Sequence, residues 1–467
     1  MRAFLTSKEM AKIDLKTMKS LSCSSYELMN LVAAEMADVL LKRFSGQPRV
    51  HILAGPGNNG GDAYCLARIL KKKSWRLSVE SVFQPESKDC RRAFKELKMK
   101  SSTPRFDSYD IIIDAVFGSG GRASLDQKLR ERIRWANQSK AFRVALDVPT
   151  GCHSDTGKAH REAFRADLSL CVSNPKWGFL FESAAEFLGE LEFVGRDFVK
   201  ATSSKAFALE ESDFGFLKQK KTAYKRGRCA IIAGSAKTPG AAFLAAESAH
   251  RTGVGYVTLI KPKKEIWNIR LKQASFLFQD SLKKSDLKKF DSLVLGCGGA
   301  PRSLSFLKNL KAPQVLDAEA IGPASKVKSS AQQIFTPHPG EAARFLKTTP
   351  QEIQSDRLGA LEAISQRLNQ AVYLKGAPGI LKLAESKAYY VNLSANPVFA
   401  RAGSGDVLAG ILGGFLAQSP TKFREAVFSS LVFQKNIGEV LRSKRATIAS
   451  DQLEIFSKAF ERIRERA

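Results

Sequence analysis

Metal-ligand patterns, disulfide patterns and long apolar runs are scarce in this 467-residue chain, and each scarcity excludes a class of protein. The five histidines lack metal-ligand spacing and the seven cysteines include no CxxC pair, so we expect no transition-metal site. Scattered cysteines in odd number favour buried free thiols over a disulfide framework. Because no run of about 18 uncharged apolar residues occurs, we predict no membrane partner or span.

The N-terminal sequence and the distribution of charge argue against secretion and against nucleic-acid binding. The N-terminal sequence MRAFLTSKEMAKID is charged again at Lys8 and Glu9, too early for a secretory apolar region, so we expect a cytoplasmic protein. The net charge is +28, but the basic residues are dispersed rather than gathered in a tail or strip. Nucleic-acid binding is therefore not expected, and anionic substrates account for the charge equally well.

Two α/β domains are predicted from length and pattern. At roughly 150 residues per domain, the chain holds two or three. Short apolar strands that end in glycine-rich turns occupy the first half, stop in a polar and basic region at residues 201–228, and then begin again. We predict domains at residues 1–205 and 212–467.

The first glycine-rich turn has the context of a dinucleotide-binding site. The apolar strand Arg49–Ala54 runs into GPGNNGGDA, with glycines at 55, 57 and 60, before a helical segment. Asn58, Asn59 and Asp62 add polar groups that such a turn does not need. Their oxygens suit a hard cation or ribose hydroxyls.

Acidic residues follow two further strands of this half. Asp114 lies at the end of one strand, and Asp147 and Thr150 lie at the end of the next. The carboxyl ends of parallel strands share one edge, where ligands bind in open α/β sheets. We therefore predict a shared site; the alternative is that each aspartate only caps the following helix.

The second half contains its most informative stretch at residues 396–414, NPVFARAGSGDVLAGILGG. Gly403 and Gly405 would let backbone N–H groups approach an anion, and a helix beginning near Asp406 would favour phosphate there. Asp406 could then deprotonate a hydroxyl that attacks phosphorus. The alternative is a glycine-rich turn with an N-capping aspartate.

Together these motifs resemble a known family along nearly the whole chain. In the first half, GPGNNGGDA, DAVFGSG and DVPTG resemble the epimerase domain of the NAD(P)H-hydrate repair family, which implies a Rossmann-like fold. In the second half, GRCAIIAGS, PGAAFLAAES, GCGGA, DAEAI, TPHPGE, LKGAPG and AGSGDVLAG resemble ADP/ATP-dependent NAD(P)H-hydrate dehydratases, which implies a ribokinase-like fold.

For the first half, the resemblance implies epimerisation of the R and S forms of NADHX and NADPHX. Potassium would be held by Asn59, Asp114 and Thr150, and Asp114 is the candidate acid/base. The residues implied to bind the hydrated dinucleotide are Asn58, Asn59, Gly60, Gly61, Asp62, Gly118, Ser119, Gly120, Gly121, Arg122, Ala123, Ser124 and Asp147.

For the second half, the resemblance implies dehydration of the S form at the expense of ADP, with AMP and phosphate as products and Mg²⁺ as the phosphate-bound ion. Asp406 would deprotonate the C6 hydroxyl so that it accepts a phosphoryl group. Ala241, Gly298 and His338 would line the hydrate site with Asp406. The residues implied to hold the nucleotide are Lys375, Gly376, Ala377, Pro378, Gly379 and Gly405.

The sequence departs from the resembled pattern in several places. Cys297 replaces the proline of GPGLG, Glu319 replaces the second aspartate of DADAL, and Gly379 replaces a threonine. LMENAG has become LMNLVA at residues 28–33. Two alternatives stay open: another ribokinase-like small-molecule kinase fused to a nucleotide-binding domain, or an N-terminal half that serves only as a scaffold. Oligomeric state is also open, with a homo-oligomer among the options.

Overall fold

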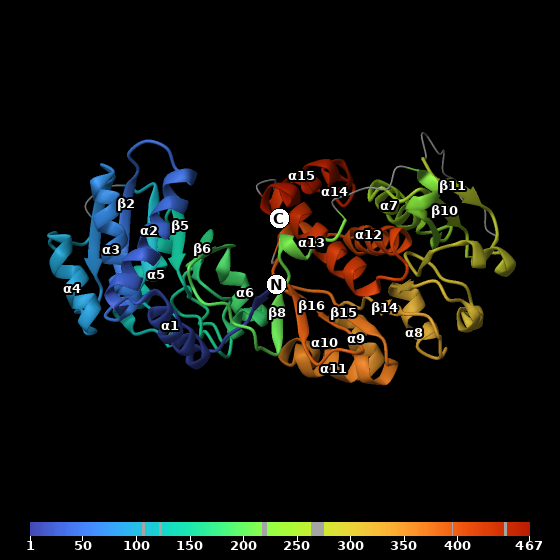
Figure 1. The fold of residues 1–467 in the computed structure, drawn as a ribbon, viewed down its shortest axis with the longest axis horizontal. Coiled ribbons are helices and arrows are strands. Elements are labelled where there is room, and N and C mark those ends of the chain that lie inside the picture. Colours follow the sequence, from blue (N-terminus) through green and yellow to red (C-terminus); the bar gives the residue numbers. More distant parts are fainter. Residues whose placement is uncertain (105–107, 121–123, 217–221, 263–274, 395, 443–445) are drawn as a thin grey trace. The chain divides into compact units, whose positions relative to one another are not determined.

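The computed structural model describes residues 1–104, 108–120, 124–216, 222–262, 275–394, 396–442 and 446–467. The chain forms two compact units, Arg2–Ser204 and Lys205–Ala467 with Met1 (Figure 1). In both units an α/β arrangement places helices against a sheet, as the strand–loop–helix pattern predicts. Within the described ranges, no helix is both long and apolar enough to cross a membrane.

The Arg2–Ser204 unit is built on a six-stranded sheet in which every neighbouring pair is parallel. The strand order is β3 (Arg76–Ser81), β2 (Arg49–Ala54), β4 (Ile111–Ala115), β5 (Phe142–Leu146), β6 (Leu168–Val172) and β7 (Glu190–Val194). The helices are α1 (Ser7–Leu21), α2 (Ser25–Arg43), α3 (Asn58–Lys72), α4 (Lys88–Leu97), α5 (Gln127–Gln138) and α6 (Glu182–Leu188). The carboxyl ends of all six strands therefore lie at one edge.

Alternation of apolar residues along the strands gives this sheet two covered faces. Val50 and Ile52 of β2 pack in one core with α2, α3 and α4, whereas Leu53 packs in the other with α5. The turn after β2 is tight, because a Cβ on Gly55 would lie 1.9 Å from the carbonyl oxygen of Val116. A side chain at Gly55 would push apart β2 and the loop after β4, which together carry the predicted site.

The Lys205–Ala467 unit contains a longer, mixed sheet. From β8 its strand order is β8 (Ala206–Ala208), β17 (Tyr389–Asn392), β16 (Gly379–Lys382), β15 (Ala371–Leu374), β14 (Gln333–Phe335), β13 (Gln314–Leu316), β12 (Ser292–Leu295), β9 (Arg228–Ile232), β10 (Tyr256–Ile260) and β11 (Leu277–Gln279). Strand β16 runs antiparallel to both of its neighbours, and the other described pairs are parallel. The parallel part again directs its strand ends to one edge.

Helices of this unit pack on both sides of the sheet. They are α7 (Pro239–Arg251), α8 (Ile321–Ala324), α9 (Pro339–Leu346), α10 (Pro350–Ser355), α11 (Arg357–Leu368), α12 (Ser404–Gln418), α13 (Phe423–Leu441), α14 (Asp451–Glu454) and α15 (Phe456–Arg466). The apolar core includes α7, α12, α13 and α15, while α11 contacts β15 and β16.

Close packing of α12 against α7 follows from glycines in the predicted stretch. A Cβ on Gly410 would lie 2.2 Å from the Ala245 carbonyl oxygen, and one on Gly414 would lie 2.7 Å from that of Ala249. The backbones can approach only because these side chains are absent. This contact fixes the axis of α12 and therefore the position of its first turn, where Asp406 lies.

Candidate functional site

The predicted edge of the Arg2–Ser204 unit contains a cavity of about 710 Å³. Its volume lies in the range of small-molecule sites. Residues after three strands line it: Gly57, Asn58, Asn59 and Asp62 after β2; Gly118, Ser119, Gly120 and Ser124 after β4; and Asp147 after β5. Most of the predicted dinucleotide contacts are therefore brought together by the sheet.

Other predicted contacts face the protein interior or lie outside the described residues. A Cβ on Gly60 would meet the Gly55 carbonyl oxygen at 2.0 Å, and one on Gly61 would meet the Met29 side chain at 2.6 Å. Packing against backbone therefore requires glycine at position 60, whereas a side chain at position 61 would displace the end of the Met29 side chain. Gly121, Arg122 and Ala123 lie outside the described residues.

The three predicted potassium ligands are all buried, and two of them, Asp114 and Thr150, are hydrogen-bonded to each other. Asp114 accepts hydrogen bonds from the backbone N–H and hydroxyl of Thr150, both at 2.7 Å, and from Val116 N–H at 3.3 Å. Asn59 donates to the carbonyl oxygen of Leu146, the last residue of β5, at 3.1 Å. Its Oδ1 atom is buried without a hydrogen-bond partner. An unsatisfied amide oxygen of this kind is what a hard cation would satisfy, so the residues fit the implied ion.

Asp114 is poorly placed as an acid/base. Its side chain is about 1% exposed, and both oxygens accept hydrogen bonds from Thr150. Burial raises its pKa to about 6, although the hydrogen bonds from Thr150 and Val116 oppose this. The catalytic role of Asp114 stays a prediction, while the cavity itself is lined by other carboxyl groups.

A buried charged group lines the cavity beside Asp147. The ammonium of Lys176 lies 2.6 Å from the Asp147 carboxylate and also donates to the carbonyl oxygens of Val172 and Asn174. Asp147 has a left-handed backbone with φ of 67°, which is unusual for a residue with a side chain. A Cβ on Gly118 would lie 3.2 Å from Asn59 Cγ and 3.3 Å from Asp147 Oδ2, so Asn59 and Asp147 lie close together.

Two further carboxyl groups face the same cavity and bind protons more readily than usual. Burial raises the pKa of Asp62 well above its ordinary range, and the neighbouring Asp147 and Asp14 raise it further. Burial likewise raises the pKa of Asp14 to about 6, against the opposing charge of Lys176. The cavity thus combines carboxyl groups of raised pKa with an ion pair, a combination suited to acid/base chemistry.

Sequence reasoning missed Lys176 and Asp14. Lys176 follows β6, a strand not predicted, and a lysine after a buried strand at the same edge was the available signal. Asp14 is four residues after Met10 on the buried face of α1, so a carboxylate on an apolar stripe was the signal there.

In the second unit, Asp406 lies in the first turn of α12, as predicted. The helix begins at Ser404, and its N-cap is Gly403 with φ of 92°, so Asp406 is not the capping residue. The alternative of an N-capping aspartate is therefore wrong. The side chain of Asp406 is left available to the edge of the sheet.

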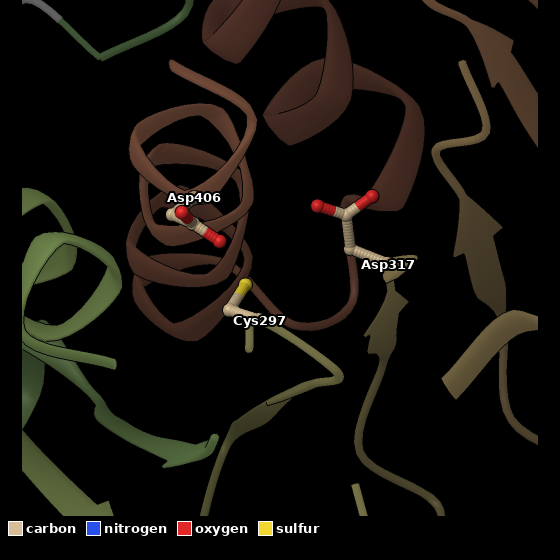
Figure 2. Close-up of side chains that lie close together, drawn as sticks. All are labelled: Cys297, Asp317 and Asp406. Atoms are coloured by element: carbon tan, nitrogen blue, oxygen red, sulfur yellow. The ribbon is translucent and has the colours of Figure 1, made fainter. Parts of the chain in front are cut away.

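The ends of strands β12 and β13 and the start of helix α12 meet around Asp406 (Figure 2). The Cys297 sulfur after β12, an Asp317 oxygen after β13 and an Asp406 oxygen all lie within 4.8 Å of one another. Burial and, to a smaller extent, the Asp317 carboxylate raise the pKa of Asp406 to about 7, while Cys297 and Lys375 oppose the shift. A carboxylate with a pKa near neutrality is suited to general-base catalysis.

Lys375 forms an ion pair inside this group. Its ammonium lies 2.6 Å from Asp317 Oδ1, which also accepts a hydrogen bond from the Thr336 hydroxyl at 2.8 Å. Burial alone would lower the pKa of Lys375, but Asp317 more than offsets this and raises it. A Cβ on Gly405 would lie 3.1 Å from the Lys375 ammonium. Gly405, Lys375 and Asp406 are therefore neighbours.

The predicted nucleotide-binding loop, Lys375 to Gly379, packs against buried side chains. The Arg357 guanidinium donates to the carbonyl oxygen of Pro378 at 2.7 Å, and a Cβ on Gly376 would clash with it. A Cβ on Gly379 would lie 1.9 Å from the Tyr373 hydroxyl oxygen. Contacts within the protein therefore account for both glycines. Nucleotide contact at these residues, and at Ala377 between them, stays a prediction.

The residues predicted to line the hydrate site fall in two places. Gly298 contacts α7, since a Cβ there would lie 2.8 Å from the Cβ of Ala241. His338 begins α9, where its Nδ1 accepts from Gly340 N–H at 3.0 Å and its side chain is about 53% exposed. The adjacent Pro337 accepts a hydrogen bond from Lys375 N–H at 2.9 Å, which joins the start of α9 to the Lys375 loop.

Comparisons with known proteins identify both units. Residues 229–460 match the family model for NAD(P)H-hydrate dehydratase, and residues 25–178 match that for the YjeF-related protein N-terminus. The bifunctional NAD(P)H-hydrate repair enzyme Nnr of Coxiella burnetii is 30% identical over 421 residues, covering 85% of this chain and 86% of that protein. The Escherichia coli enzyme of the same name is 29% identical over 462 residues, covering 94% of this chain and 89% of that protein.

A solved structure is similar to the second unit. An ADP/ATP-dependent NAD(P)H-hydrate dehydratase from Bacillus subtilis, co-crystallised with ATP and Mg²⁺, is 22% identical, with a TM-score of 0.46 over 53% of this chain and 93% of that protein. The predicted fold class, a Rossmann-like unit followed by a ribokinase-like unit, is confirmed by the family matches and the two sheets. The chain therefore belongs to the family of bifunctional NAD(P)H-hydrate repair enzymes.

Proposed function

We propose that this chain repairs hydrated nicotinamide nucleotides at two active sites. Residues 1–205 form an epimerase that interconverts the R and S forms of NADHX and NADPHX. Residues 212–467 form a dehydratase that returns the S form to NADH or NADPH at the expense of ADP, releasing AMP and phosphate. The observation that carries the proposal is the group of Asp406, Asp317 and Lys375 beside the first turn of α12, in a chain with relatives of this activity along most of its length.

At the dehydratase site, Asp406 takes the proton from the C6 hydroxyl, and the oxygen then attacks the terminal phosphorus of ADP. Hydroxide is a poor leaving group, whereas phosphate leaves readily. Electrons from the ring nitrogen expel phosphate from C6, and loss of a proton from C5 restores the dihydropyridine ring. Lys375 and the N-terminal backbone of α12 stabilise phosphate charge during transfer, and Ala241, Gly298 and His338 contact the hydrate.

Magnesium bound with the nucleotide would offset phosphate charge. Asp317 is the residue whose donor chemistry fits the ion, since it is a carboxylate beside Asp406. Cys297 does not fit it, because magnesium prefers oxygen ligands. Nucleotide contacts are assigned to Lys375, Gly376, Ala377, Pro378, Gly379 and Gly405.

At the epimerase site, the cavity lined by Asn58, Asn59, Asp62 and Gly118 holds the hydrated dinucleotide. The C6 hydroxyl and the ring nitrogen form a hemiaminal, which opens when the hydroxyl loses a proton and the nitrogen gains one. Rotation and closure on the other face give the other epimer. We assign these proton transfers to Asp62 and to the Asp147–Lys176 pair, because these groups line the cavity.

Potassium would be held by Asn59, Asp114 and Thr150, where it would supply a fixed positive charge. The unsatisfied Asn59 oxygen and the Asp114–Thr150 hydrogen bonds support this assignment. The seven cysteines are all free thiols, which supports a cytoplasmic location. A kinase for another small molecule is the alternative for the second unit, with the first acting as a scaffold.

The proposal is tested with a mixture of R and S hydrate, supplied with ADP or ATP, by following recovery of reduced-nicotinamide absorbance. We expect complete recovery, and faster recovery with ADP. Recovery that stalls once the S form is consumed would contradict the epimerase assignment. No recovery with either nucleotide would contradict the dehydratase assignment.

A pH profile tests the role of Asp406 as base. Because the carboxylate must be unprotonated to accept the hydroxyl proton, kcat/KM should rise about tenfold per pH unit below the pKa and level off above about 7. The measurement follows S-hydrate dehydration between about pH 5.5 and 8.5. In Glu319→Gln, removal of a nearby negative charge should move the profile to lower pH while turnover is retained. A profile that is flat in this range would exclude Asp406 as the titrating base.

A further inference from the structure

Cys297 brings a sulfur atom into the acidic group of the second unit. It follows β12 in a turn where Gly296 leaves no room for a side chain, since a Cβ there would lie 1.8 Å from the Asp317 carbonyl oxygen. Its own carbonyl oxygen accepts a hydrogen bond from Gly234 N–H at 2.8 Å. The Cys297 side chain is fully buried, and Figure 2 shows it directed toward Asp406. The thiol position is therefore fixed by the backbone on both sides.

Asp317 presents an uncommitted oxygen to the same space. Its side chain is about 3% exposed, and the hydrogen bonds it receives from described side chains, those of Lys375 and Thr336, both reach Oδ1. A Cβ on Gly405 would lie 3.6 Å from Oδ2, so the second oxygen faces the start of α12. A buried carboxylate held through one oxygen leaves the other free to bind a ligand.

The chemistry of these three donors selects one class of ligand. Their ligand atoms lie within 4.8 Å of one another. Zinc bonds of about 2.3 Å to sulfur and 2.0–2.2 Å to oxygen place tetrahedral ligands roughly 3.3–3.7 Å apart, so closure by about 1 Å through side-chain rotation suffices. A thiolate with two carboxylates favours zinc or cadmium over magnesium or calcium.

We propose that Cys297, Asp317 and Asp406 form an inhibitory site for a thiophilic divalent cation, with Zn²⁺ or Cd²⁺ as the ligand. The cation bonds to the Asp406 oxygen that would otherwise take the hydroxyl proton, and the Cys297 thiol proton is released to solvent. The binding part stands on geometry alone, whereas the inhibitory part rests on the proposed function. Cys297 replaces the proline of the resembled motif, so the site belongs to this chain's own sequence.

Binding is tested on the full chain with Cd²⁺ alone, without nucleotide. We expect a thiolate-to-cadmium charge-transfer band that saturates at one ion per chain, and displacement of Cd²⁺ by Zn²⁺ but not by Mg²⁺. Cys297→Ala should abolish the band. Cys229→Ala is the matched control, because Cys229 is also fully buried but pairs with Ser292 at the opposite end of β12, and it should leave the band intact. A band unchanged in Cys297→Ala would overturn the site.

Inhibition is tested by titrating Zn²⁺ into S-hydrate dehydration, with each variant compared to its own uninhibited rate. We expect a chelator to reverse the inhibition, and the Zn²⁺ concentration for half-inhibition to rise about 100-fold or more in Cys297→Ala but not in Cys229→Ala. Equal inhibition of wild type and Cys297→Ala would overturn the inhibitory role. If the protein had no dehydratase activity, the proposed function would be wrong. The cadmium band would still show whether the ion binds at Cys297.

Discussion

Asp406→Asn is expected to lower dehydratase turnover by about 10³-fold, because the amide cannot accept the hydroxyl proton. The side chains are nearly the same size, and Gly403 rather than Asp406 caps α12, so the helix should begin at the same residue. Loss of one negative charge beside Asp317 should not weaken nucleotide binding. The measurement is kcat for purified S hydrate with saturating ADP.

The internal control for this variant is the other active site of the same chain. Epimerisation of R to S hydrate by Asp406→Asn should match wild type when it is read by adding a separate dehydratase. Wild-type dehydration by the variant would remove Asp406 from the mechanism. Loss of both activities would point to misfolding, which circular dichroism and hydrogen exchange in α12 would detect.

Lys176→Met should lower the epimerisation rate to within about 100-fold of the uncatalysed rate. It should also lower the free energy of unfolding of the Arg2–Ser204 unit by about 3–5 kcal/mol. The substitution leaves the Asp147 carboxylate buried at the cavity without its cation, and it removes donors to the carbonyl oxygens of Val172 and Asn174. Hydrogen exchange in β5 and β6 reports the stability of the Arg2–Ser204 unit within the full chain. Lys158→Met is the matched control, since Lys158 is exposed.

A double variant separates stability from catalysis at this pair. Asp147→Asn combined with Lys176→Met removes both charges, so part of the lost stability should return. Epimerisation should stay lost, because neither the carboxylate nor the ammonium is present. Dehydration of S hydrate should proceed normally in all of these variants. A folded Lys176→Met protein with wild-type epimerisation would exclude the pair from proton transfer.

Local patterns were sufficient to locate most of the strands that carry the sites. The strand Arg49–Ala54 was predicted with the same bounds as β2, because apolar residues end abruptly at a glycine-rich turn. The strands ending near Asp114 and Asp147 were found in the same way, and the rule that parallel strands share one edge brought their ends together. Asp406 was placed in a first helical turn for the same local reason.

The polar partners of these residues were harder to predict, since they come from elements distant in sequence. Asp14 reaches the epimerase cavity from α1, and Lys176 reaches it from the loop after β6. Nothing local to either residue indicates that Asp147 lies 2.6 Å from an ammonium group. Likewise, Lys375 pairs with an aspartate 58 positions earlier in the chain.

Several glycines of the predicted binding motifs have a packing role that the motifs did not indicate. Gly60, Gly61, Gly376 and Gly379 were all predicted as ligand contacts because they belong to ligand-binding motifs. The structure gives each a packing reason as well, since a Cβ would meet Gly55, Met29, Arg357 or Tyr373 respectively. Only the packed chain reveals which neighbour occupies the space that glycine leaves.

The sequence alone determined that two α/β units follow one another, where their strands end, and which motifs lie at those ends, because apolar periodicity and glycine turns are local properties. Tertiary structure decided which polar groups meet: Lys176 with Asp147, Lys375 with Asp317, and the Cys297 thiol with Asp406. Those contacts depend on the strand order of each sheet and, in the second unit, on the close approach of α12 to α7, which packing across the sheet sets. The proton affinities of Asp62 and Asp406 follow from the same packing, since burial is the largest cause of each shift.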